Sequence, residues 1–209
     1  MIRVLVADDH AVVRRGIRQI LHETEDIVVA GEASSAAEVW PKALEERFHA
    51  LILDVNLPGR SGLELLTDLK SQKPDLPVII LTMYSEAQYA VRALKSGASG
   101  FLTKESAPDK LIEAIRKVVQ GGRFITAEVA ERLATSVGRG DGPPHESLTD
   151  REFQVLKMIG SGKTVSQIGR ELSLSVKTIS THRTRILRKM SLKTNSELTH
   201  YAIRNHLVE

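Results

Sequence analysis

Four short apolar runs in the first half of the chain each end at side chains that could do chemistry. Ile2–Ala7 precedes Asp8 and Asp9, Ala50–Leu53 precedes Asp54, Val78–Leu81 precedes Thr82, and Gly100–Thr103 precedes Lys104. A short apolar run closed by turn residues predicts a strand that is buried on both faces. In an open α/β sheet, ligands bind at the carboxyl ends of the strands. We therefore expect three carboxylates, a hydroxyl and an ammonium to meet at one edge of a sheet.

Such a group of side chains is suited to a divalent metal ion and a phosphoryl group. Crowded carboxylates repel one another, and a hard cation relieves that repulsion. Asp9 and Asp54, together with the backbone carbonyl of Asn56, are the expected Mg²⁺ ligands, and Asp8 is expected to act through water. An oxygen of Asp54 could attack a phosphoryl group in line and form an acyl phosphate. Lys104 and Thr82 are then expected to contact the other phosphoryl oxygens.

Each of these residues alone has a simpler explanation. An aspartate at a strand end is commonly a helix cap or part of a solvated turn, Thr82 could cap a helix, and Lys104 could be a surface charge. Only the placement of all these residues at the same edge of the sheet favours a phosphorylatable site.

Strand and helix patterns alternate through about the first 120 residues, which predicts βαβ units and a parallel sheet. A further strand is expected over Ile27–Ala33, and helices over 11–21, 35–47, 61–71, 86–95 and from 106 to just before Gly121. Pro41 lies inside the second helix and should kink or shorten it, because proline removes a backbone hydrogen bond. Residues 106–109 predict a capping box with an early proline at the start of the fifth.

The order Asp-Asp, Asp, Thr and Lys on successive strand ends, with Gly-Ala-Ser-Gly-Phe-Leu-Thr-Lys over 97–104, resembles the receiver domain of two-component response regulators. The resemblance covers residues 1–123 and implies a flavodoxin-like (βα)5 fold. It also implies that Asp54 is the phospho-acceptor and that a sensor histidine kinase is the phosphodonor. In receivers an aromatic side chain fills the space behind the switch threonine when the hydroxyl moves toward the phosphoryl group. Phe101 is the candidate here, and ordinary core packing is the alternative.

Residues 124–146 are expected to form a linker. Within it, 126–136 could form a short amphipathic helix, whereas 138–144 is rich in glycine and proline, has no apolar period, and predicts a flexible tether.

The remainder, residues 147–209, predicts a small all-α domain. Thr149, Thr164 and Thr194 are each followed three residues later by Glu or Gln, which is the capping-box pattern at the start of a helix. A three-residue turn over 173–175 separates the second and third helices, and this is the spacing of a helix-turn-helix.

The third helix has one apolar and one cationic side. At 100° per residue, Val176, Ile179, Ile186, Leu187 and Met190 fall in one arc and are expected to pack inward. Residues 177–193 contain six cations and no acid, which suits nucleic acid, although a solvated helix face is the alternative. Arg183 lies in the apolar arc and could reach a phosphate or water. The expected contacts with double-stranded DNA are Lys177, Thr178, Ser180, Thr181, His182, Arg183, Thr184, Arg185, Arg188 and Lys189.

The pattern Leu-Thr-Asp-Arg-Glu over 148–152, followed by Ser-Val-Lys-Thr-Ile-Ser-Thr-His-Arg over 175–183, resembles a LuxR-type helix-turn-helix. A receiver followed by this module is similar to the NarL/FixJ class of response regulators. In that class bases are read from the middle of the third helix, which corresponds to Ser180, Thr181 and Thr184. Gln167 and Gly169 depart from the usual Glu and Ala of the second helix.

In the same class the last helix can pair two modules on an inverted-repeat operator. Leu198, Tyr201 and Ala202 are the candidate contacts for a homodimer, with ordinary core as the alternative. Phosphorylation is expected to free the third helix or to promote dimerisation.

The composition excludes several other classes. The chain has no cysteine, so it has neither disulfides nor a thiolate metal site, and no apolar run approaches membrane-spanning length. We expect a cytoplasmic protein without a membrane partner. Residues 1–125 carry 16 basic against 17 acidic side chains, whereas 126–209 carry 13 against 9, so positive charge concentrates in the second part.

Two rival functions stay open. The first domain could be a constitutive or protein-regulated interaction module, although the complete acidic set argues against this. It could also be a phosphatase that uses Asp54 as nucleophile. Asn56 stands where such enzymes keep a general acid, so we expect no turnover of outside substrates, only phosphorylation of Asp54 itself and its slow hydrolysis.

Overall fold

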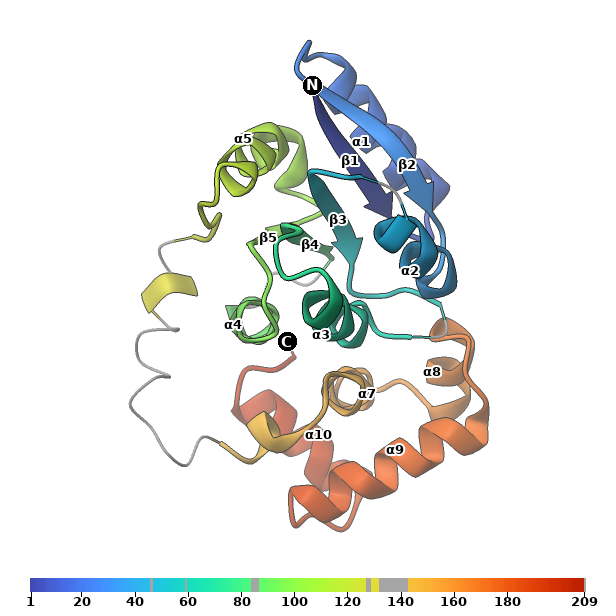
Figure 1. Ribbon diagram of the computed structural model, residues 1–209. Coiled ribbons are helices and arrows are strands. Elements are labelled where there is room, and N and C mark those ends of the chain that lie inside the picture. Colours follow the sequence, from blue (N-terminus) through green and yellow to red (C-terminus); the bar gives the residue numbers. More distant parts are fainter. Residues whose placement is uncertain (46, 59, 84–86, 127–128, 132–142, 209) are drawn as a thin grey trace. The chain divides into compact units, whose positions relative to one another are not determined.

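The computed structural model describes residues 1–45, 47–58, 60–83, 87–126, 129–131 and 143–208 (Figure 1). The chain forms two compact units, Met1–Thr135 and Ser136–Glu209. The predicted domain limits at residues 123 and 147 stay predictions, and each unit is described by itself.

The first unit is built on a five-stranded sheet in which every pairing is parallel. The strand order is β2-β1-β3-β4-β5. The strands are β1 (Ile2–Ala7), β2 (Ile27–Ala33), β3 (Ala50–Asp54), β4 (Val78–Thr82) and β5 (Gly100–Thr103). This is the flavodoxin-like order, in which the chain reverses direction across the sheet between β1 and β3. The predicted α/β fold is confirmed.

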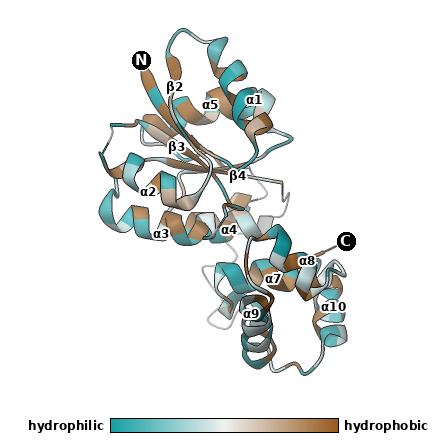
Figure 2. Ribbon diagram, turned by 90° about the vertical axis from the view of Figure 1, so that its right-hand side faces the viewer, coloured by the Kyte–Doolittle hydropathy of each residue, from teal (hydrophilic) through white to brown (hydrophobic). Residues whose placement is uncertain are grey.

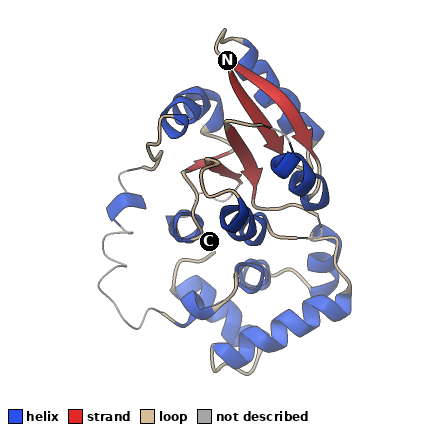
Figure 3. Ribbon diagram, in the orientation of Figure 1, coloured by secondary structure: helices blue, strands red, loops and turns tan. Residues whose placement is uncertain are grey.

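Helices cover both faces of this sheet. They are α1 (Ala11–His22), α2 (Ala36–Glu45), α3 (Gly62–Gln72), α4 (Ala87–Lys95) and α5 (Ala107–Val119). Residues of α1 and α5 share one core with alternate residues of β1, β3 and β4, while α2, α3 and α4 lie on the opposite face (Figure 3). The strands of this sheet are mostly hydrophobic, as Figure 2 shows, because a parallel sheet is buried on both faces.

One predicted helix is shorter than its expected limit, as its internal proline predicted, and one predicted helix cap is wrong. α2 contains Pro41 and ends at Glu45, short of the predicted limit at Arg47. Ser106 forms no capping box, because its backbone is helical rather than extended, at φ −83° and ψ −10°. Its hydroxyl instead donates to the carbonyl of Thr103 over 3.1 Å.

Phe124 extends the sheet beyond β5. Its amide donates to Ser99 O over 2.9 Å, and its carbonyl accepts from the Phe101 amide over 3.1 Å. The first residue of the predicted linker is therefore bonded to the edge of the sheet. Most of the predicted helix over 126–136 and of the tether over 138–144 lies outside the described residues.

The second unit is all-helical. A 3₁₀ turn, η1 (Pro144–Ser147), precedes α7 (Asp150–Gly160), α8 (Val165–Glu171), α9 (Val176–Lys189) and α10 (Asn195–Arg204). α8 and α9 are joined by the predicted turn, in which Ser173 has a left-handed backbone with φ 53°. A Cβ at Gly169 would lie 2.8 Å from the carbonyl oxygen of Leu174, so the glycine has a steric reason in this chain. The predicted helix-turn-helix is present.

The caps of these helices agree with the capping boxes predicted from the sequence, with one exception. The boxes at Thr149 and Thr164 have both of their hydrogen bonds. At Thr194 the hydroxyl accepts from the Glu197 amide, but the Glu197 carboxylate accepts from the Lys193 amide over 2.7 Å instead. The third box is therefore only half formed. Among the described residues, no helix has the length and apolar character needed to cross a membrane.

Candidate functional site

The carboxylate of Asp54 lies at the end of β3 and is nearly inaccessible to solvent, with 1% exposed. Lys104, one residue after β5, places its Nζ 2.7 Å from Asp54 Oδ2 and 2.7 Å from Asp8 Oδ2. The strands converge on this point because they are parallel and because β3 lies between β1 and β4. One ammonium thus bridges two buried carboxylates that stand 46 residues apart in sequence.

The buried charges perturb one another. Burial raises the pKa of the Asp54 carboxyl, and the neighbouring Asp8 carboxylate adds to this effect, so the contact with Lys104 lowers it only in part. Burial lowers the pKa of the Lys104 ammonium, but Asp54 and Asp8 outweigh it and the net shift is upward. Two buried carboxylates, those of Asp8 and Asp54, thus share one ammonium.

The remaining acidic groups lie close to the first two. Ligand atoms of Asp8, Asp9, His10 and Asp54 all fall within 4.8 Å of one another. Oxygen donors of this kind, with an excess of negative charge, suit a hard cation such as Mg²⁺. The backbone amide of Asn56 donates to Asp54 Oδ1 over 3.1 Å, so residue 56 is also held at this edge of the sheet.

Two neighbours of the acidic group do not belong to the predicted metal and phosphoryl ligands. His10 Nδ1 lies 2.7 Å from Asp9 Oδ1, although its ring is largely exposed. Arg14 donates from α1 to the backbone carbonyl of Asp8 over 2.7 Å and to Glu32 of β2 over 3.0 Å. Arg14 thus ties the Asp8 backbone to α1 and β2. No sequence motif indicates this tie, since it depends on how α1 lies on the sheet.

The two predicted switch residues lie on neighbouring strands. Thr82 is the last residue of β4, is fully buried, and accepts through its backbone carbonyl from the Lys104 amide over 2.7 Å. Thr82 pairs with Thr103, and Ile80 pairs with Phe101, so Thr82 and Phe101 face the same side of the sheet. Phe101 is 7% exposed. This placement agrees with the predicted switch role, and it is equally the placement of an ordinary core residue.

Gly62 lets the start of α3 lie against the backbone of Asp54, the candidate phospho-acceptor. A Cβ added to Gly62, the first residue of α3, would lie 2.1 Å from the backbone oxygen of Asp54. The Gly62 amide also donates to Val55 O over 2.9 Å. Only glycine allows α3 to begin this close to the end of β3.

In the second unit, most of the residues predicted to contact DNA are accessible. Lys177, Ser180, Thr181, Thr184, Arg185, Arg188 and Lys189 are exposed, and Thr178, His182 and Arg183 are partly buried. The buried side of α9 is formed by Ile179, Ile186 and the cap residue Met190. Val176 was predicted to pack inward, and this is wrong. It is 51% exposed because it is the first residue of α9.

Several of these side chains are engaged within the unit. Lys189 Nζ donates to Glu152 Oε2 over 2.7 Å and to Ser147 O over 3.3 Å. Arg183 bonds to the side chain of Asn195 rather than to solvent alone. The backbone amide of Thr178 donates the N-cap hydrogen bond to Ser175 Oγ over 3.0 Å. The hydroxyls of Thr181 and Thr184 donate to the carbonyls of Lys177 and Ser180, each over 3.0 Å.

The candidate dimer residues of α10 are mostly core. Leu198 and Ala202 are completely buried, and a Cβ at Gly160 of α7 would lie 2.7 Å from that of Ala202. Tyr201 is partly exposed, and its hydroxyl lies 2.8 Å from His145 Nδ1. Of the two alternatives for this face, the structure therefore assigns Leu198 and Ala202 to the core. Ile203, at 52% exposed, is the accessible apolar residue of α10.

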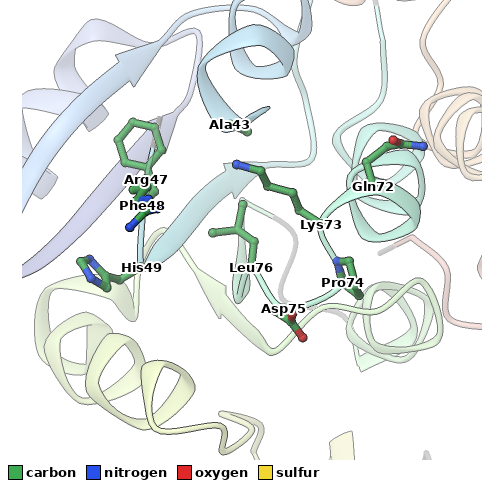
Figure 4. Close-up of a pocket in the computed structure, with 9 residues that line it drawn as sticks. All are labelled: Ala43, Arg47, Phe48, His49, Gln72, Lys73, Pro74, Asp75 and Leu76. Carbon is green, nitrogen blue, oxygen red and sulfur yellow. The ribbon is translucent and has the colours of Figure 1, made fainter. Parts of the chain in front are cut away.

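A separate hollow of about 430 Å³ lies where the loops before β3 and β4 approach each other (Figure 4). Arg47, His49, Lys73 and Asp75 are among the residues that line it. The strands start at this edge, whereas Asp54 and Lys104 follow the strand ends, so the hollow is not part of the acidic site.

Two family models match the chain. The response regulator receiver domain matches residues 4–116, and the luxR family of bacterial regulatory proteins matches residues 146–202. A parallel α/β receiver with an acidic edge, followed by a helix-turn-helix unit, defines a transcriptional response regulator. The chain belongs to the two-component response regulators of the NarL/FixJ class.

Curated relatives span the whole chain. The response regulator GacA of Pseudomonas protegens is 38% identical over 210 residues, which cover 100% of this chain and 99% of that protein. The response regulator UvrY of Escherichia coli is 36% identical over 209 residues, 99% of this chain and 96% of that protein. Among solved structures, RcsB of Salmonella enterica serovar Typhimurium, bound to a promoter in the presence of the phosphomimetic BeF₃⁻, matches with a TM-score of 0.64. Its identity is 27%, over 96% of this chain and 97% of that one.

Proposed function

We propose that a sensor histidine kinase phosphorylates Asp54 in the presence of Mg²⁺, and that the phosphoryl group controls DNA binding by the LuxR-type unit. Asp9, Asp54 and the carbonyl of Asn56 would hold the metal ion, with Asp8 acting through water. The observation that carries the proposal is the bridging of Asp8 and Asp54 by Lys104 inside a buried, net acidic group.

The chemistry follows from these groups. An oxygen of Asp54 attacks phosphorus, and the P–N bond of the phosphohistidine breaks with its electron pair returning to the imidazole. Lys104, already 2.7 Å from Asp54 Oδ2, would then donate to a phosphoryl oxygen and stabilise its negative charge. When bound, Mg²⁺ neutralises charge on the phosphoryl group. Thr82 would donate its hydroxyl to another phosphoryl oxygen, and Phe101 would take up the space vacated on the same side of the sheet.

The output would be the affinity of α9 for DNA. Lys177, Arg185 and Arg188 are exposed and form no ion pair among the described residues, so they are available to phosphates. The match to promoter-bound RcsB supports this role for the second unit. A homodimer on an inverted-repeat operator remains part of the proposal, with Tyr201 as the accessible member of the predicted contacts.

The rival functions are less well supported. Asn56 cannot act as the general acid that a phosphatase with Asp54 as nucleophile would need. A constitutive module would have no need for the Lys104 bridge between two buried carboxylates.

The test is the intact mass of the protein after incubation with Mg²⁺ and acetyl phosphate. We expect one phosphoryl adduct on the wild type, labile to hydroxylamine, and none on Asp54→Asn. Asp75→Asn, which changes an exposed carboxylate at the other edge of the sheet, is the matched control and should keep the adduct. The absence of an adduct on folded wild-type protein would remove the phosphorylation claim and leave DNA binding standing. Equal DNA affinity before and after phosphorylation would instead remove the switch.

A further inference from the structure

The hydroxyls of the two threonines at the centre of the exposed face of α9 are turned back onto the helix. Thr181 Oγ1 donates to Lys177 O and Thr184 Oγ1 donates to Ser180 O, each over 3.0 Å. A threonine hydroxyl has one hydrogen, so in both residues the donor is already used. Because Oγ1 and the γ-methyl group share one carbon, this leaves the methyl as the part of each side chain that a groove would meet.

The two threonines share the accessible face of α9 with longer cations. At 100° per residue, Thr184 and Thr181 lie about 60° apart on the accessible side of the helix. Lys177 and Arg188 lie inside the same arc, and their side chains are several bonds longer. The longer cations can reach phosphates while the short methyl-bearing side chains approach the bases.

We propose that this surface reads the 5-methyl groups of thymine, so that the target contains A·T pairs at the positions facing Thr181 and Thr184. The proposal rests on the proposed DNA binding by α9 and specifies what it recognises. The C5-methyl of thymine is the apolar group that base pairs present in the major groove, and threonine methyl groups are among its usual partners. Recognition through donated hydrogen bonds would require both threonine hydroxyls to break their bonds to the helix.

The first experiment compares thymine with uracil in the DNA. Full-length protein with Mg²⁺ and BeF₃⁻ selects its site from a randomised duplex library. Dissociation constants are then measured for the selected duplex and for copies in which deoxyuridine replaces thymidine at one A·T pair at a time. This replacement removes only the methyl group. We expect a loss of about fourfold in affinity at two or more positions, which is the effect of one buried methyl group.

The second experiment removes the hydroxyl group and the methyl group of the threonine side chain separately. Thr184→Val keeps the methyl group and removes the hydroxyl, whereas Thr184→Ser does the reverse; Thr181 offers the same pair. In the serine variant, the ratio of the uracil to the thymine dissociation constant should fall to about 1 at the position facing the residue. In the valine variant the ratio should stay near fourfold.

The outcomes separate this inference from the function on which it rests. A selected site whose uracil copies bind as tightly as the thymine duplex overturns the inference alone. So does loss of discrimination in the valine variant with retention in the serine variant, because the hydroxyl would then read the base. If no sequence is enriched from the library, sequence-specific DNA binding fails, and the inference fails with it.

Discussion

Lys189 Nζ donates to Glu152 Oε2 over 2.7 Å, which joins the last residue of α9 to the first turn of α7. The same carboxylate accepts from the Thr149 amide over 2.9 Å as the second arm of the capping box. Glu152 is 2% exposed. Lys189, which was predicted to contact DNA, is therefore engaged in holding α9 against α7.

Replacing Glu152 by glutamine should destabilise the second unit. The amide oxygen can still accept from Thr149, but Lys189 then faces a neutral amide instead of a carboxylate, so we expect a loss of about 1–2 kcal/mol in the free energy of unfolding. Urea unfolding followed by circular dichroism measures it. Glu171→Gln, which breaks the exposed pair with Lys163, is the matched control and should cost less than about 0.5 kcal/mol. Equal effects of the two variants would contradict a special role for Glu152.

The contribution of Glu152 should depend on pH. Burial raises the pKa of this carboxyl, but the bonds from Lys189 and Thr149 outweigh burial and the net shift is downward from 4.5. A carboxyl with a lowered folded pKa stabilises the protein above its unfolded pKa, and this stabilisation is lost as the pH falls through the folded value. The difference in unfolding free energy between wild type and Glu152→Gln should therefore be full at pH 7 and shrink below pH 4.5. If this difference in unfolding free energy instead increased as the pH fell, the pKa of Glu152 would be raised in the folded protein rather than lowered.

Asp54→Asn should stabilise the metal-free protein at neutral pH. Burial raises the pKa of the Asp54 carboxyl, so the folded state favours the protonated form and loses stability as the pH rises through that pKa. Asparagine removes the charge and keeps the shape. Thermal unfolding in the presence of a chelator should show a higher Tm for the variant at pH 7, and the gain should diminish toward pH 4. A lower Tm for the variant at pH 7 would mean that Lys104 more than compensates the buried carboxylate.

Mg²⁺ should raise the Tm of the wild type through the same acidic group. A ligand that binds only the folded state stabilises it by about 2.7 kcal/mol at 100 times its Kd. Asp9→Asn should reduce this Mg²⁺-dependent shift while leaving the metal-free Tm close to that of the wild type, since the Asp9 side chain is one-third exposed. An unchanged shift in the variant would remove Asp9 from the set of ligands.

Two glycines allow a matched test of the backbone at the phospho-acceptor. Gly62→Ala would force a methyl group to within 2.1 Å of Asp54 O, so we expect a loss of about 2–3 kcal/mol and impaired phosphorylation of Asp54. Gly16→Ala makes the same change inside α1, where a Cβ would meet no atom within 4 Å. It should stabilise the protein by about 0.5–1 kcal/mol, because alanine favours the helix. Similar unfolding free energies for the two variants would contradict the close approach at Gly62.

The sequence predicted the sheet and its acidic edge because both depend on local signals. Apolar runs define parallel strands, and parallel strands bring their following residues together without further information. Of the four predicted capping boxes, those at Thr149 and Thr164 are complete, and each needs only residues three apart. The Ser106 box was wrong because the residue pattern does not specify a backbone angle.

The contacts that were missed join residues far apart in the chain. Glu152 and Lys189 are separated by 37 residues, and His145 and Tyr201 by 56. Neither pair has a spacing that a helix or turn would produce. The same holds for the exposure of Val176, because it depends on which part of α9 the other helices cover. These features follow from packing, which the sequence alone does not specify.

The local hydrogen bonds at Thr149, Thr164 and Ser175 also bear on how the two units acquire their structure. Each sets the start of a helix by pairing residues three positions apart. The receiver sheet instead needs strands such as β1 and β3, whose partners Val4 and Ala50 are 46 residues apart. Folding slows as contacts become less local. We therefore expect the second unit to fold faster than the receiver, although it leaves the ribosome after the receiver.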